Sequence, residues 1–259
     1  MHIYKLGKSP ARKDLRTFRI TDYTELPPAP ADVDWTAKVP QYGMLCNDTL
    51  GCCVIAGMMH LAMQQRAQVG LPVSVPSDAE VIAAYSAIGG YVPGDPGTDQ
   101  GCNLLDALTY WRKYGLKFGG IKHRITAFAQ VPLHNPEKLA SANWLFGGVI
   151  DGLALPLVAQ GATVWTNPKS LRGRNSPGSW GGHCVVTCKD LGPLGQAANQ
   201  GCAYGVVTWG SLMPEGQGFR NDYEDETYVV MSPEWIESQT GKSPAGFNVN
   251  QLMADLRAL

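Results

Sequence analysis

The sequence has 259 residues, of which 44% are apolar and 17% are charged, and its formal net charge is −1. This length suits one large domain or two small ones, and the composition excludes an intrinsically disordered chain. The densest basic run, 169–174, is typical of a solvated loop rather than of a nucleic-acid-binding face. No apolar run reaches the ~18 residues that a membrane helix needs. We therefore expect neither a nucleic-acid partner nor a membrane.

The N-terminus and the cysteines both indicate a reducing compartment. The first 18 residues, MHIYKLGKSPARKDLRTF, are charged throughout and lack the apolar core of a signal peptide. Seven cysteines, an odd number, argue against a complete disulfide framework. Cys184, Cys188 and Cys202 could bind zinc together with His183, but paired CxxC knuckles are absent, so buried free thiols are favoured. We expect a cytoplasmic protein without metal or cofactor, unless it leaves the cell by lysis or without a signal.

The first half of the chain predicts three helices behind an extended arm. Residues 1–32 show no clear period, and their PPAPAD stretch is typical of a polyproline-like lead-in. The run CCVIAGMMHLAMQQRAQ (52–68) is almost wholly apolar over its first turns, which predicts a helix buried on most sides. Further helices are predicted at 79–88, after a Pro-Ser-Asp start, and at 104–115, ending at a glycine.

The second half of the chain predicts strands. One more helix is expected near 136–146, and strands are expected at 147–155, 183–191, 202–210 and 226–232. Residues 250–259 predict a terminal helix. Because helices precede strands, we expect an α+β fold with two lobes. The expected division is an arm at 1–32 and a single domain at 33–259, with a helical lobe to about 125, a β-rich lobe at 126–232 and an extension from 233.

A cysteine and a distant histidine carry the clearest chemistry. A thiolate nucleophile needs a lowered pKa, a nearby base and donors for the oxyanion. Cys53 lies at a predicted helix start, where free N–H groups favour negative charge. Asn47, six residues upstream, could supply a second oxyanion donor, and His183, 130 residues downstream, opens a predicted strand and could be the base. Cys52 remains an alternative nucleophile, although the spacing from Asn47 favours Cys53.

Five segments, in order, resemble the papain-like cysteine peptidases. Residues 33–35 resemble the Val-Asp-Trp near the start of the mature domain, and 47–53 resemble the Gln…Cys-Gly-Ser-Cys segment. Residues 101–103 resemble the family's Gly-Cys-Asn-Gly-Gly segment, which lines the substrate cleft. Residues 182–185 resemble the His-Ala-Val segment that carries the catalytic base, and residues 207–210 resemble the family's Asn-Ser-Trp-Gly segment. The resemblance spans roughly residues 30–232. The chain is also similar to bacterial and phage-borne papain-like proteins.

The resemblance implies a two-lobed fold, with a helical N-terminal lobe and an antiparallel sheet or barrel in the C-terminal lobe. It assigns catalytic roles to Cys53, His183 and Asn47. It also implies a substrate cleft lined by Gly101, Cys102, Asn103, Gly182 and Trp209. The orienting Asn of the family has no clear counterpart, because alignment on Trp209 puts Val207 there and a shift of one residue puts Thr208 there. We expect Thr208 to orient His183, and a weaker orienter would slow the reaction without abolishing it.

Three functions stay open at this point. The first is a peptidase or amidase that acts on peptide or protein substrates through a thiolate–imidazolium pair. The second is a weak or inactive papain-fold protein that binds an assembly partner such as a virion component, favoured by the missing Asn and by an N-terminal region that is short for an inhibitory pro-segment. The third is acyl transfer by the same pair. The acidic run 224–226 is expected to be a solvated turn.

Overall fold

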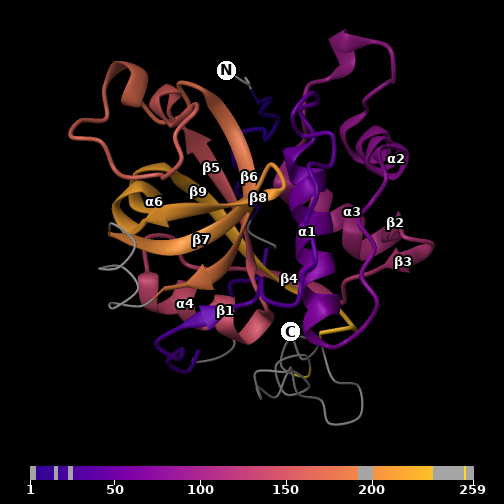
Figure 1. Ribbon diagram of the computed structural model, residues 1–259, viewed down its shortest axis with the longest axis horizontal. Coiled ribbons are helices and arrows are strands. Elements are labelled where there is room, and N and C mark those ends of the chain that lie inside the picture. The colour runs from indigo at the N-terminus through magenta and orange to yellow at the C-terminus, as the bar shows by residue number, and fades with distance from the viewer. Residues whose placement is uncertain (1–3, 15–16, 23–25, 192–200, 236–253, 255–259) are drawn as a thin grey trace.

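The computed structural model describes residues 4–14, 17–22, 26–191, 201–235 and 254. The chain folds into a helical lobe and a β-rich lobe that lie side by side (Figure 1). Short 3-10 helices occur at Ile20–Asp22, Pro96–Thr98, Leu157–Ala159 and Gly173–Asn175. In the described part of the chain, no helix is long and apolar enough to cross a membrane.

The helical lobe is built around α1 (Cys53–Gln68), which is buried over nearly its whole length. It packs with α2 (Asp78–Gly89) and α3 (Leu104–Tyr114), followed by the short hairpin of β2 (Leu116–Phe118) and β3 (Ile121–His123). Ser77 forms a capping box at the start of α2, and Asn103 caps α3 through the N–H of Asp106. Local polar side chains therefore define the starts of α2 and α3.

The β-rich lobe contains an antiparallel sheet in the order β4-β9-β5-β6-β7-β8, and β1 pairs with β6 beside this path. The short strands are β1 (Val33–Asp34), β4 (Ala127–Gln130) and β8 (Ser211–Gly216). The longer ones are β5 (Val149–Leu155), β6 (Gly181–Asp190), β7 (Cys202–Thr208) and β9 (Glu224–Met231). Two helices, α4 (Pro136–Phe146) and α6 (Gln217–Tyr223), complete the lobe. The sheet thus places β6 next to both β5 and β7.

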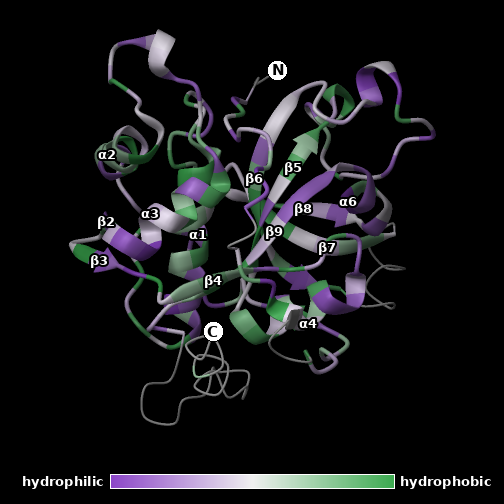
Figure 2. Cartoon of the chain, turned by 180° about the vertical axis from the view of Figure 1, so that it is seen from behind, coloured by the Kyte–Doolittle hydropathy of each residue, from purple (hydrophilic) through white to green (hydrophobic). Residues whose placement is uncertain are grey.

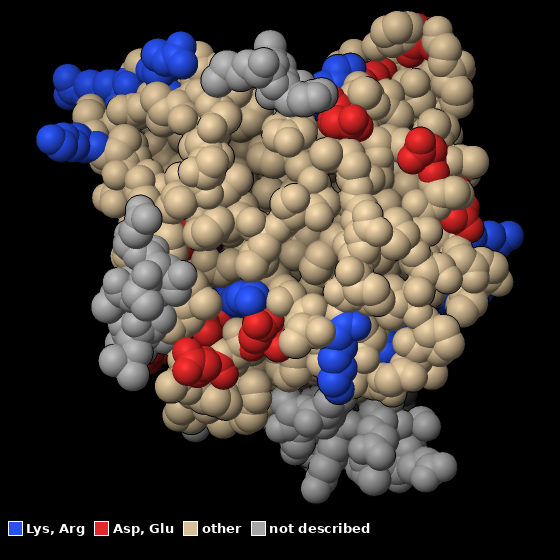
Figure 3. Space-filling model, in the orientation of Figure 1, with Lys and Arg blue, Asp and Glu red and all other residues tan. Residues whose placement is uncertain are grey.

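The two lobes share one apolar core, formed where α1 packs against the sheet. Figure 2 shows apolar residues along both α1 and β5. Gln64 and Gln65 of α1 donate to the carbonyls of Gly147 and Phe146, so buried amides join the lobes as well. On the face in Figure 3, a broad central area carries no charged side chain, and a group of acidic and basic side chains lies below it. Charges buried inside the protein need a structural reason.

The predicted helices at 52–68, 79–88, 104–115 and 136–146 are confirmed to within about two residues, as are the four predicted strands. The α+β, two-lobed architecture is confirmed as well. The acidic run 224–226 was wrongly expected to be a solvated turn: it begins β9, and Glu226 is 1% exposed. The predicted terminal helix at 250–259 lies outside the described residues, apart from residue 254.

A buried ionic cluster surrounds Arg220 of α6. Its guanidinium contacts the carboxylates of Asp151, Glu215 and Glu224, at 3.1, 2.8 and 2.7 Å. Three carboxylates thus face one cation. Burial raises the pKa of Glu215 to about 7, with Arg220 opposing the rise and the other two carboxylates adding to it.

Glu215→Gln should flatten the pH dependence of stability. An unfolded glutamate has a pKa of about 4.3, so between there and about 7 the folded chain holds a proton that the unfolded chain has lost. The contribution of Glu215 to the free energy of unfolding is fully present below this pH window. As the pH rises through the window, this free energy falls by about 1.4 kcal/mol per pH unit. Urea unfolding across the window measures the slope. Exposed Glu137→Gln should keep the wild-type slope, and an unchanged slope in Glu215→Gln would contradict the prediction.

Candidate active site

Cys53 begins α1, and its sulfur lies between the two lobes. The backbone N–H groups of Cys184, Gly7 and Val54 face the sulfur, and Cys184 directly follows His183 on β6. Cys52 precedes the helix as its N-cap and points its thiol elsewhere, toward the carbonyl of Leu45 at 3.3 Å. Both cysteines are buried. These contacts place Cys53, rather than Cys52, beside the histidine strand.

His183 is held by the strand next to its own. Its Nε2 lies 2.6 Å from the hydroxyl of Thr208, the last residue of β7. Val207 packs into the shared core instead, so of these two residues Thr208 is the one that contacts the imidazole. Among the described residues, Nδ1 of His183 has no hydrogen-bond partner. The imidazole is therefore anchored through one nitrogen, and the Cys53–His183 hydrogen bond is not formed in this arrangement.

A tight hairpin turn positions the tryptophan over this imidazole. Trp209 and Gly210 connect β7 to β8 with φ values of 46° and 71°, the pattern of a type I′ turn. A positive φ is uncommon for a residue with a large side chain, and such backbone often occurs at functional sites. The indole stacks on His183 with centroids 4.4 Å apart. The Trp-Gly turn thus covers one face of the histidine and shields it from water.

The N-terminal segment, which we define as residues 4–10, lies across the site. The N–H of Lys8 donates to the carbonyl of Gly182 in the β-rich lobe at 3.0 Å. The N–H of Cys102 donates to the carbonyl of Gly7 at 2.9 Å, and the N–H of Ser9 donates to the carbonyl of Cys102 at 3.1 Å. Tyr4 stacks on the indole of Trp209 with centroids 4.6 Å apart. The segment is therefore bonded to both lobes at once.

Close backbone contacts bring this segment down to Cys53. A Cβ at Gly7 would lie 1.8 Å from the carbonyl oxygen of Gly51, and a Cβ at Gly101 would lie 1.8 Å from that of Gly7. Only glycines can approach this closely. The N–H of Gly7 faces the Cys53 sulfur. The segment therefore lies directly beside the Cys53 thiol.

The residues assigned to the substrate cleft all border this path. Gly182 and Cys102 bond to the segment through their backbones, and the amide of Asn103 donates to the carbonyl of Pro10 at 3.1 Å. Asn47 is 2% exposed, and its Nδ2 lies 3.4 Å from the carbonyl of Lys5 and 3.3 Å from that of Leu50. The side chain expected to bind an oxyanion thus contacts a backbone carbonyl of the segment.

The electrostatics of the covered site oppose an ion pair. Burial raises the pKa of the Cys53 thiol, although backbone N–H groups and Lys8 act in the other direction. Burial also lowers the pKa of His183 to about 3, and the nearby charge of Lys8 adds to this. Both shifts favour the neutral thiol and the neutral imidazole over a thiolate–imidazolium pair while the segment is in place.

Sequence reasoning missed the N-terminal segment and the residues that hold it. The region was expected to be too short for an inhibitory pro-segment, yet residues 4–10 suffice to cross the site. The Lys8 side chain is buried between Asp225 and Glu226, which belong to the misassigned acidic run. Lys5 also forms an ion pair with Asp99, which accepts from the N–H of Gly51. The one sequence signal for this segment is Gly7 followed by Lys8, in an arm that otherwise shows no clear period.

Several solved structures similar to this one are cysteine proteases. Xylellain, a cysteine protease from Xylella fastidiosa, superimposes with a TM-score of 0.64 and 15% identity, covering 88% of this chain and 96% of that one. The chain has the papain-like fold. Digestive procathepsin L2 from Tenebrio molitor larval midgut has a TM-score of 0.61 and 14% identity, and the match covers 88% of this chain and 78% of that one. Procathepsin B S9 from Trypanosoma congolense has a TM-score of 0.54 and 16% identity, and the match covers 88% of this chain and 86% of that one. No family model matches the sequence, and no curated protein matches it significantly.

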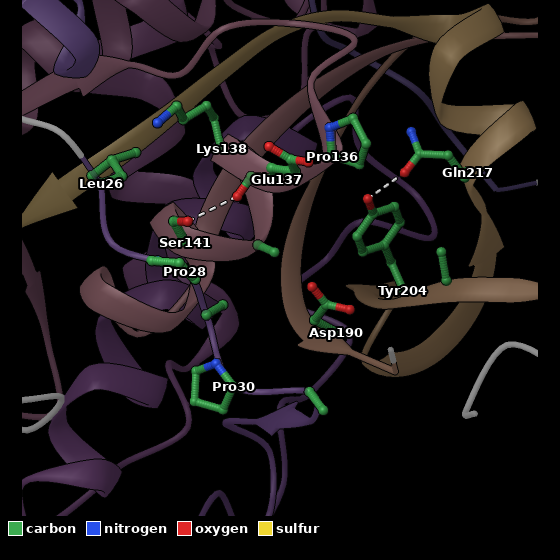
Figure 4. Close-up of a pocket in the computed structure, with 14 residues that line it drawn as sticks. Leu26, Pro28, Pro30, Pro136, Glu137, Lys138, Ser141, Asp190, Tyr204 and Gln217 are labelled. Carbon is green, nitrogen blue, oxygen red and sulfur yellow. Dashed lines mark hydrogen bonds between the residues drawn. The ribbon is translucent and has the colours of Figure 1, made fainter. Parts of the chain in front are cut away.

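A separate hollow of about 630 Å³ lies away from the residues described above (Figure 4). Leu26, residues 28–31, the start of α4 and part of β7 line it, and at its edge the hydroxyl of Tyr204 donates to Gln217. Its lining contains neither a cysteine nor a histidine. Cys53 and His183 instead belong to α1 and β6, which pack against each other.

Proposed function

We propose that this protein is a papain-like cysteine peptidase or amidase whose active site is closed by its own N-terminal segment. The observation that carries the proposal is the convergence of Cys53, His183 and Thr208 on the path of a bound polypeptide backbone. The segment is bonded along the cleft as an extended peptide would be, and one of its carbonyls contacts Asn47. Peptide or protein substrates are therefore the class that fits.

In the proposed reaction, the segment first leaves the cleft and water reaches both side chains, which removes the burial that keeps them neutral. The Cys53 thiol gives its proton to Nδ1 of His183, and the sulfur attacks the substrate carbonyl carbon. The oxyanion is held by the N–H of Cys53 and the amide of Asn47. His183 then protonates the leaving amine, and water hydrolyses the thioester to free the thiol. An amine in place of water would make the reaction an acyl transfer.

The test uses the full chain with the segment displaced. In the open variant, Gly7→Val with Lys8→Ser, the added side chain collides with the Gly51 backbone and the buried cation is gone. We expect this variant to cleave members of a fluorogenic peptide library, and we expect the same variant with Cys53→Ala to be folded and inactive. Turnover that survives Cys53→Ala would place the nucleophile elsewhere. No turnover in an open variant whose Cys53 reacts with iodoacetamide would overturn the proposal.

Two observations favour the second function, a papain-fold protein without catalysis. Nδ1 of His183 lacks a hydrogen-bond partner within the described residues, and the segment fills the cleft. An inactive protein would then use the cleft to hold a peptide rather than to cut it. Peptide binding by the open variant without turnover is the result expected for this alternative.

Thr208→Val tests the positioning role of the threonine hydroxyl. The change keeps the shape of the side chain but removes the group 2.6 Å from Nε2, so the imidazole loses its orienting contact. In the open variant we expect kcat to fall about 10- to 100-fold with little change in KM. Thr208→Ser restores a hydroxyl and should recover most of the rate. An equal loss in both variants would indicate a packing effect instead.

A further inference from the structure

Lys8 fills a deep acidic pocket beside the candidate active site. Its side chain is fully buried, and its ammonium lies 3.0 Å from the carboxylates of both Asp225 and Glu226. Glu226 also accepts a hydrogen bond from the hydroxyl of Tyr228 at 3.1 Å. Two carboxylates thus face a single ammonium inside the protein, where unpaired charge is costly.

Glycines on neighbouring strands shape this pocket for a long side chain. A Cβ at Gly152 of β5 would lie 2.0 Å from Cε of Lys8, and a Cβ at Gly182 of β6 would lie 2.1 Å from the Lys8 carbonyl oxygen. Any other residue at Gly152 would occupy the channel that the lysine stem now fills. The pocket is therefore open to a chain of several methylenes with a charged end.

An irregularity in the sheet brings both carboxylates to the same point. In the pairing of β5 with β9, Gly152 is opposite Glu226 and Leu153 is opposite Glu224, so Asp225 is an extra, unpaired residue. A bulge of this kind redirects side chains that would otherwise alternate between faces. Because of it, neighbouring residues reach one cation. Buried carboxylates destabilise a fold unless they are paired, so this arrangement depends on a cation that enters the pocket.

The pocket also has an unused acceptor. Within the described residues, Oδ1 of Asp225 has no hydrogen-bond partner, while Oδ2 accepts from Lys8. A guanidinium, with five donors, could use this second oxygen. The backbone of Lys8 bonds to Gly182, the residue before His183, and the preceding Gly7 faces the Cys53 sulfur. A peptide bound along this path would place a side chain in the pocket close to the reacting bond.

We propose that this acidic pocket, once the N-terminal segment leaves, selects peptide substrates with a lysine or arginine near the scissile bond. Lys8 then acts as an internal substitute for that substrate side chain. The inference rests on the proposed function for its catalytic part, whereas the preference of the pocket for a cation stands on the Lys8 contacts alone. An apolar pocket would instead prefer leucine, and this residue is the competing outcome.

The first experiment measures substrate preference in the open variant, Gly7→Val with Lys8→Ser. A fluorogenic library varies each position around the cleaved bond among lysine, arginine, leucine and glutamate. We expect kcat/KM to be about 100-fold higher with a basic residue at one position, and Asp225→Asn with Glu226→Gln to reduce this ratio to near one. A preference for leucine, or a basic preference that survives neutralisation, would overturn the proposal.

The second experiment needs no catalysis. The open variant with Cys53→Ala is titrated with a labelled peptide of residues 4–14, YKLGKSPARKD, and with the same peptide carrying Lys8→Met. We expect the lysine peptide to bind about 100-fold more tightly, and the advantage to vanish after neutralisation of Asp225 and Glu226. Selective binding here, combined with no turnover in the first experiment, would refute the proposed enzymatic activity and keep the proposed pocket. Turnover in the first experiment, combined with no selective binding here, would refute the proposed pocket and keep the enzymatic activity.

Discussion

Lys8→Glu should expose Cys53 and raise its rate of alkylation by at least about 100-fold. The substituted carboxylate would meet Asp225 and Glu226 in place of an ammonium 3.0 Å from each. Breaking a buried ion pair typically costs 3–5 kcal/mol, and each 1.36 kcal/mol is a tenfold change in the population of the open state. The other contacts of the segment, such as its three backbone hydrogen bonds and the Tyr4–Trp209 stack, are unchanged by the substitution and therefore do not alter this ratio.

The measurement is the rate of iodoacetamide incorporation at Cys53, followed by mass spectrometry of the peptide that contains it. Lys13→Glu is the matched control, because it makes the same change of charge on an exposed side chain of the same arm. We expect this control to react as slowly as the wild type, and Lys8→Arg to remain nearly as slow. Equal rates in Lys8→Glu and the wild type would show that the segment does not protect the thiol.

Local patterns explain why much of the fold was predictable. The apolar run that forms α1 is long enough to predict a helix buried on most sides. Ser77 and Asn103 mark the starts of the helices that they cap. Strands such as β6 and β7 are β-branched and bounded by glycine. These signals act over a few residues, so a single sequence is enough to detect them.

The candidate site was only partly predictable, because its remaining parts depend on register and on distant contacts. The choice between Val207 and Thr208 depends on the type I′ turn at Trp209, which fixes the face each side chain takes. Lys8 and Asp225 are 217 residues apart, and no local pattern links them. Consecutive acidic residues usually mark a solvated turn, and here a bulge turns them inward instead.

Arg220→Met should be the most destabilising single change in the β-rich lobe, at about 3–5 kcal/mol. The guanidinium is 1% exposed and joins α6 to Asp151 on β5, Glu215 on β8 and Glu224 on β9. Methionine fills similar volume but leaves three carboxylates without their cation. Urea unfolding followed by near-ultraviolet circular dichroism measures the loss, and exposed Arg124→Met is the matched control. A loss below about 1 kcal/mol would contradict this role of the cluster.

Adding Glu215→Gln to Arg220→Met separates lost charge from lost packing. If unpaired carboxylates cause the damage, removing one of them should recover part of the stability, and the two changes should be strongly non-additive. Additive losses would mean that Arg220 acts through packing, for instance over the ring of Tyr204, 4.9 Å away. Glu224 begins β9 two residues before Glu226, so the same cluster anchors the strand that carries the Lys8 pocket. Arg220→Met should therefore also accelerate alkylation of Cys53 under conditions where the chain is still folded.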